Sequence, residues 1–227
     1  MTEIDAATTR LLTTAERLRD HEWSSPTECA GWSRAHVLAH LALNAEGLTR
    51  ALRALLESKA APMYASQTVR DADIETLAAQ PAATIRDRLR TASDGLAEVL
   101  EELPRLPADA TFERTPHGQR MLAHDVPLLR LTEVEIHHAD LHEGYGYADW
   151  PLETAVRLLE RGVDRYDGPP LSAHATDLDR TYRLGSPTDG DPVVSGPGAA
   201  LAWWLTGRDP GEDLSSTTGV LPEMEGR

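Results

Sequence analysis

Two segments of this chain place ionisable side chains on the apolar face of a helix, and this pattern constrains the fold more than any other feature of the sequence. The first segment is 34–58, in which one broad apolar arc recurs at helical spacing: Val37, Leu41, Leu48, Leu52 and Leu55. His40 and Asn44 fall inside that arc, whereas His36 lies at its edge. We therefore expect His40 to point into the protein interior.

The second segment is 122–143, where Glu133, His137 and Asp140 share one face with leucine, valine and isoleucine side chains. Glu135, His138 and His142 fall on the other side, where we expect them to be solvated. A buried carboxylate without a partner is costly and is normally paired or neutralised. The inward residues therefore need partners from another element.

His40 from one helix, meeting Glu133 and His137 from the other, indicates a cation between the two helices. Two imidazoles and one carboxylate suit Zn²⁺, and three protein ligands leave a fourth position open, as catalytic zinc sites do. His36 and Asn44 are candidates to orient the ligands. The alternative is a core histidine that is hydrogen-bonded to a glutamate, with no metal.

Other familiar chemistries have little support in the sequence. The chain has neither a glycine-rich phosphate loop nor a G-x-S-x-G nucleophile elbow. Cys29 is the only cysteine, so it forms no intramolecular disulfide, and beside a tryptophan we interpret it as a small packed hydrophobe.

The predicted secondary structure changes from helices alone to a mixture of helices and strands about two thirds of the way along the chain. Before that point, helical patterns cover 3–20, 34–58, 72–80, 82–103 and 122–143, which predicts a helical bundle. The segment GYGYADWP at 144–151 then marks a break. Beyond it we expect a helix over 151–166, strands within 179–185 and 191–196, a helix that Gly207 stops, and a further strand in the tail at 215–224. The prediction is an α+β protein with domains 1–147 and 148–227.

The charge balance limits the partners. Lys and Arg number 22 and Asp and Glu number 37 among 227 residues, which gives a net charge of −15 and disfavours nucleic acids and anionic membranes. No apolar run approaches the roughly 20 residues needed to cross a bilayer. The start, MTEIDAATTR, has neither a basic leader nor an apolar signal core. We therefore expect a cytoplasmic protein that is a monomer and binds small molecules.

Four stretches together resemble the mycothiol-dependent maleylpyruvate isomerases: GWSRAHVLAHLALNAEGL, PMYASQTVRDADIE, LTEVEIHHADL and GRDPGEDLSSTTGVLPE. The resemblance implies an N-terminal DinB-like four-helix bundle that holds zinc on His40, Glu133 and His137, followed by a small α/β domain. It also implies mycothiol as the thiol cofactor and the cis–trans conversion of maleylpyruvate to fumarylpyruvate in the gentisate pathway. Arg70 and Arg208 match the arginines that handle the substrate carboxylates in that family.

Two other functions stay open. A thiol S-transferase of the same DinB-like type would conjugate mycothiol to another electrophile and consume the thiol, whereas an isomerase regenerates it. A non-enzymatic zinc regulator would close the coordination sphere with a fourth protein ligand, for which Cys29 is the candidate.

Overall fold

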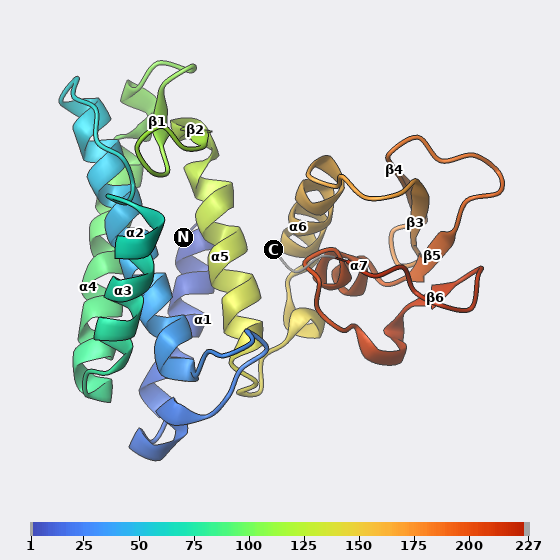
Figure 1. The fold of residues 1–227 in the computed structure, drawn as a ribbon, viewed down its shortest axis with the longest axis horizontal. Helices are drawn as coiled ribbons and strands as arrows, with labels where there is room; N and C mark the ends of the chain where they lie inside the picture. The colour runs from blue at the N-terminus through green and yellow to red at the C-terminus, as the bar shows by residue number, and fades with distance from the viewer. Residues whose placement is uncertain (1, 225–227) are drawn as a thin grey trace. The chain divides into compact units, whose positions relative to one another are not determined.

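The computed structural model describes residues 2–224, and the chain divides into two units, 1–143 and 144–227. The first unit is mainly helical, and the second combines helices with a small sheet (Figure 1). The protein is therefore a mixed helix and sheet protein. Among the described residues, no helix is both long and apolar enough to cross a membrane.

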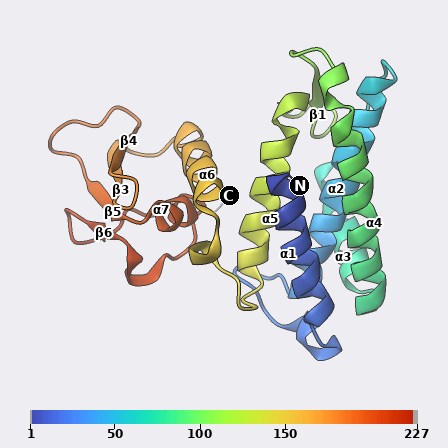
Figure 2. The same cartoon turned by 180° about the vertical axis from the view of Figure 1, so that it is seen from behind.

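Four long helices of the first unit run side by side, and a fifth lies against one of them (Figures 1 and 2). The long ones are α1 (Glu3–Arg17), α2 (Arg34–Leu56), α4 (Ala82–Glu101) and α5 (Val126–Asp140), and the fifth is α3 (Gln67–Ala78) on α2. Leucines from all four long helices meet in a common core, among them Leu11, Leu38, Leu89 and Leu131. Burial of this apolar surface is the main force that holds the helices together.

Helix α3 begins at Gln67, five residues earlier than the pattern at 72–80 predicts. Ser66 is its N-cap, and the Ser66 side chain accepts a hydrogen bond from the backbone amide of Val69 at 3.1 Å. The additional turn carries Arg70. The position of the cap therefore decides that Arg70 belongs to a helix instead of the preceding loop.

A short hairpin in the first unit was not predicted. Strands β1 (Thr111–Glu113) and β2 (Arg120–Leu122) pair antiparallel, and each is too short to show an alternating pattern. The backbone amides of Met63 and Tyr64 donate to the carbonyls of Glu113 and Arg114. This pairing fixes the segment that leads into α3.

Helix α5 is buried on two sides, so the expectation that Glu135 and His138 are solvated was wrong. Glu135 is fully buried and pairs with Arg10 of α1 at 2.6 Å, and the ring of His138 lies 2.8 Å from the hydroxyl of Thr14. The helix also ends earlier than the predicted 122–143, and it begins later because residues 123–125 form a 3₁₀ turn before it. A polar face of a helix is solvated only if no other element covers it.

The second unit contains α6 (Leu152–Asp164), α7 (Gly198–Trp204) and a four-stranded sheet. The strands are β3 (Leu171–Ala175), β4 (Arg180–Leu184), β5 (Val193–Gly196) and β6 (Ser215–Ser216), in the order β4–β3–β5–β6. Only the β3–β5 pair is parallel. The strands predicted at 179–185 and 191–196 are confirmed, whereas β3 was not predicted.

Candidate metal centre

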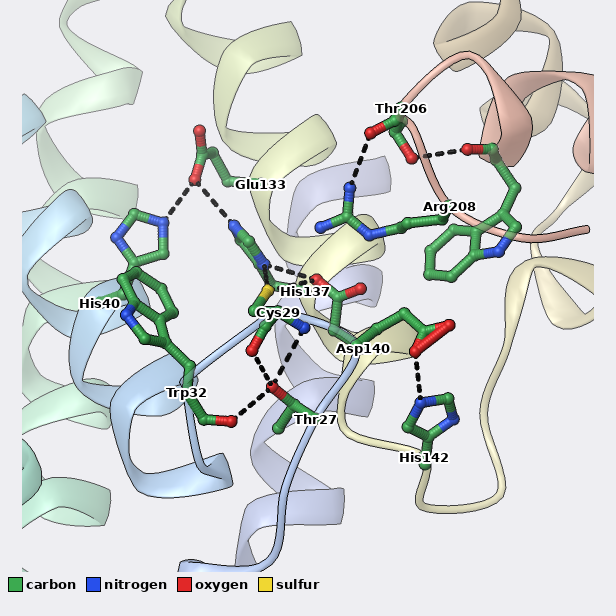
Figure 3. Close-up of polar contacts among 12 residues, drawn as sticks. Thr27, Cys29, Trp32, His40, Glu133, His137, Asp140, His142, Thr206 and Arg208 are labelled. Atoms are coloured by element: carbon green, nitrogen blue, oxygen red, sulfur yellow. Dashed lines mark hydrogen bonds and ion pairs between the residues drawn. The ribbon is translucent and has the colours of Figure 1, made fainter. Parts of the chain in front are cut away.

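Side chains from α2 and α5 converge at one place in the first unit (Figure 3). The Nε2 atom of His40 lies 2.8 Å from Oε2 of Glu133, and Nε2 of His137 lies 3.6 Å from the same oxygen. The rings of His40 and His137 meet edge to face, with centroids 4.8 Å apart. One ligand atom from each residue lies within 4.8 Å of the others, so the three predicted ligands are brought together.

Helical geometry explains why these residues meet. Glu133 and His137 are four residues apart on α5 and therefore lie on successive turns of one face. His40 projects from the buried face of α2, and its side chain is 6% exposed, against 16% for His137 and 35% for Glu133. The group is therefore buried on the side of His40 and accessible to solvent on the side of Glu133.

The second ring nitrogen of His137 has a partner of its own. Its Nδ1 lies 2.7 Å from Oδ2 of Asp140, a residue that is fully buried. The thiol of Cys29 donates to the same oxygen at 3.2 Å, and its sulfur is 3.7 Å from Nδ1 of His137 (Figure 3). Because an ionised carboxylate only accepts hydrogen bonds, Nδ1 of His137 donates to Asp140, and Nε2 is the nitrogen that faces Glu133.

Cys29, His137 and Asp140 form a second group whose atoms are close enough to hold a metal ion. The distance of 2.7 Å between Nδ1 of His137 and Oδ2 of Asp140 is that of a charge-assisted hydrogen bond. Cys29 is adjacent to Nδ1, whereas Glu133 is adjacent to Nε2. The sulfur therefore meets the opposite side of the His137 ring from the one that faces His40 and Glu133.

His40 has a different neighbour on its second nitrogen. Nη2 of Arg70 lies 3.1 Å from Nδ1 of His40. The Arg70 guanidinium also lies 6.0 Å from the ring centre of Trp32 and 5.8 Å from that of Tyr64, and its Nη1 donates to Asp71 at 2.8 Å. The predicted substrate arginine is thus in direct contact with a predicted metal ligand, and it also makes the ion pair with Asp71.

The surroundings of His40 and Glu133 set their protonation in different ways. Burial lowers the pKa of His40 to about 4, against the opposing effect of Glu133, so the ring is neutral at pH 7. Burial raises the pKa of the Glu133 carboxyl, but interactions with His40, His137 and Arg130 outweigh this, and the pKa lies well below its usual range. A neutral imidazole and an ionised carboxylate are the forms that bind a metal ion.

Arg130 is a residue of this centre that the helical pattern did not reveal. It is 1% exposed, and its Nη1 donates to the backbone carbonyl of Leu41 and to Oδ1 of Asn44, both at 2.9 Å. Burial lowers the pKa of Arg130 to about 10, so it keeps its charge at neutral pH. It lies one turn before Glu133 on α5 and ties this helix to α2. A buried arginine inside a run of leucines was the signal in the sequence.

Two other sequence candidates have partners away from the ligands. The imidazole of His36 contacts the hydroxyl of Ser33 at 2.7 Å and the carboxylate of Glu75 at 3.2 Å. Asn44 accepts from Arg130. Neither arrangement is the one we expected of a residue that orients a ligand.

Comparison with known proteins identifies the family. A family model described as the mycothiol maleylpyruvate isomerase N-terminal domain matches residues 4–142, which is more than half of the chain. The chain belongs to this family. The family is named for an enzyme, and the matched part contains His40, Glu133 and His137.

Two solved structures share the fold of this chain over nearly its whole length. They are a crystal structure of the mycothiol-dependent maleylpyruvate isomerase and one of its histidine-to-alanine mutant, with TM-scores of 0.85 and 0.84. Each is 22% identical in sequence, and each match covers 99% of this chain and 94% of the other. A search of curated proteins gave no match.

Arg208, the second arginine that the isomerase resemblance singled out, lies in the second unit. Its guanidinium is 5.2 Å from the ring centre of Trp203, and Nη1 donates to the backbone carbonyl of Thr206 at 3.3 Å (Figure 3). These contacts with Trp203 and Thr206 restrict the orientation of the Arg208 guanidinium.

Proposed function

We propose that this protein is a zinc- and mycothiol-dependent isomerase that converts maleylpyruvate to fumarylpyruvate by reversible addition of a thiol to the cis double bond. The observation that carries the proposal is the convergence of His40, Glu133 and His137 within the part of the chain that matches the isomerase family. We also propose that the helices of domain 1–147 form a DinB-like four-helix bundle, and that the enzyme acts as a cytoplasmic monomer.

The donor set fits zinc. Two imidazole nitrogens and one carboxylate oxygen are the ligands of many catalytic zinc sites, and three protein ligands leave a position for an exogenous one. Nε2 of His137 and Oε2 of Glu133 lie 3.6 Å apart, beyond the length of a normal hydrogen bond, so both atoms can bind one cation placed between them. Zinc bound there would supply the Lewis acidity that deprotonates a thiol at neutral pH.

The chain's own residues have separate tasks in this proposal. His40, Glu133 and His137 hold the metal, and Asp140 fixes the proton of His137 on Nδ1, which leaves Nε2 free to coordinate. His40, together with the charges of His137 and Arg130, keeps the Glu133 carboxyl ionised, and Arg130 holds α5 against α2.

The substrate carries two carboxylates, and the chain carries a net charge of −15, so the site must provide fixed positive charge. Arg70 and Arg208 provide it in this proposal. A planar guanidinium binds a carboxylate through two parallel hydrogen bonds, which sets the orientation of the anion as well as its affinity.

The test is an assay of the purified protein with maleylpyruvate and zinc, with and without mycothiol, followed by the absorbance of the product. We expect turnover only when the thiol is present, and no loss of thiol over many turnovers. His137→Ala is the matched inactive control. Stoichiometric loss of the thiol would instead identify an S-transferase, and zinc binding without turnover on any thiol acceptor would favour the regulatory alternative.

A further inference from the structure

The two histidines of the metal centre have different kinds of partner on Nδ1. Nδ1 of His137 donates to the carboxylate of Asp140 at 2.7 Å, so Nε2 is the nitrogen that faces Glu133. On His40, the neighbour of Nδ1 is Arg70, at 3.1 Å. A guanidinium has donors only, so Nδ1 of His40 accepts this hydrogen bond, and the single proton of the neutral ring is on Nε2, which donates it to Glu133 at 2.8 Å.

This arrangement of His40 is incompatible with a metal ion on Nε2. Coordination needs the lone pair of Nε2, so the proton of the neutral ring must then be on Nδ1. An Nδ1–H group would face an N–H group of Arg70 at 3.1 Å, with no acceptor between them. The contact between Arg70 and His40 and the coordination of a metal by His40 therefore exclude each other.

The remaining contacts of Arg70 involve Nη1 and two aromatic rings. Nη1 is held by Asp71, and the guanidinium lies beside the rings of Trp32 and Tyr64. Its Nε is buried and has no hydrogen-bond partner among residues 2–224. Once Nη2 leaves His40, Nε and Nη2 form a complete two-donor edge, which is the edge that binds a carboxylate bidentately.

We propose that metal binding at His40 displaces Arg70 and turns its Nε and Nη2 edge into a carboxylate-binding site, so that the metal and a carboxylate anion bind cooperatively. This inference rests on the metal site of the proposed function. Without the metal, Nη2 of Arg70 donates to His40, so of the two donors on this edge only Nε is available to the anion. Without the anion, the metal must break a hydrogen bond that nothing replaces. By linkage, each ligand then strengthens the other by the same factor.

The experiment is a zinc titration by competition with a chromophoric chelator, in the presence and absence of maleate as the dicarboxylate probe. The proteins are the wild type, Arg70→Ala and the matched control Arg114→Ala. The Arg114 guanidinium lies 5.6 Å from the same Tyr64 ring but donates to Gln67 and not to His40, so its removal reports the loss of one nearby positive charge alone.

We expect maleate to tighten zinc binding to the wild type by roughly tenfold, about the contribution of one charged hydrogen-bonding contact. Arg70→Ala should bind zinc more tightly than Arg114→Ala when maleate is absent, because it has no contact to break. Maleate should not change the zinc affinity of Arg70→Ala. Equal zinc affinities for the two variants, or an effect of maleate that survives in Arg70→Ala, would overturn the inference.

Long-range ¹H–¹⁵N spectra of the histidine rings test the tautomers directly. The metal-free protein should carry the His40 proton on Nε2 and the zinc-loaded protein on Nδ1, whereas His137 should keep its proton on Nδ1 in both. A His40 proton on Nδ1 in the metal-free protein contradicts the inference but leaves the proposed function intact. If the folded wild-type protein binds no zinc, both the inference and the proposed function are wrong.

Discussion

Oδ2 of Asp140 lies 2.7 Å from Nδ1 of His137, and no part of Asp140 is exposed to solvent. The two residues are three positions apart on α5, so the helix itself sets their separation. A carboxylate in this place fixes both the tautomer and the orientation of the ring, as it does for metal-binding histidines in general.

Asp140→Asn should weaken zinc binding by about 10- to 100-fold, because a neutral amide holds the Nδ1 proton less firmly. Chelator competition measures the affinity, and a circular dichroism melt checks the fold. Asp94→Asn, which removes an exposed carboxylate from α4, is the control for the loss of charge. A wild-type zinc affinity in Asp140→Asn would show that Asp140 does not position His137.

Neighbouring histidines on α5 should have opposite effects on zinc binding. His137→Ala should lose zinc and activity together, because two ligands remain, and it should also lose stability because the fully buried Asp140 loses its hydrogen bond. His138→Ala should keep stoichiometric zinc but lose about 1–3 kcal/mol of stability, since it removes a buried side chain and leaves the partly buried hydroxyl of Thr14 without this contact. Metal analysis distinguishes the two variants, and thermal melts measure the stability that each loses. Zinc retained by His137→Ala and lost by His138→Ala would show that the register of the site is wrong.

Cys29 should be dispensable for turnover. Its thiol contacts Asp140, and a serine hydroxyl can donate to the same oxygen, so Cys29→Ser should keep its zinc and most of its kcat/KM. The attacking sulfur in the proposed reaction is supplied by the cofactor. Complete loss of turnover with the zinc content unchanged would indicate a nucleophile on the protein itself.

Arg208→Ala should lower kcat/KM by about ten- to thousandfold while zinc stays bound, if Arg208 holds a substrate carboxylate through two charged hydrogen bonds. Arg208→Lys should recover only part of the loss, because lysine lacks the planar fork. Steady-state kinetics and metal analysis provide the measurement. An alanine variant that loses melting temperature but keeps kcat/KM would assign Arg208 to the packing around Trp203.

The sequence by itself placed His40, Glu133 and His137 on inward helix faces. Helical periodicity is a local property, and a polar residue inside an apolar arc is visible without knowledge of its neighbours. The same periodicity placed Asp140 beside His137. These residues were therefore predicted from the two segments alone, and the structure brings them together.

Only the tertiary structure decided what covers each face and which nitrogen of each ring is engaged. The burial of Glu135 and His138 depends on α1, which lies more than 100 residues away in the chain. The contact between Arg70 and His40 depends on the start of α3 and on its packing against α2. Periodicity shows which way a side chain points, but long-range packing supplies the neighbour that it meets, and that neighbour fixes its charge and its tautomer.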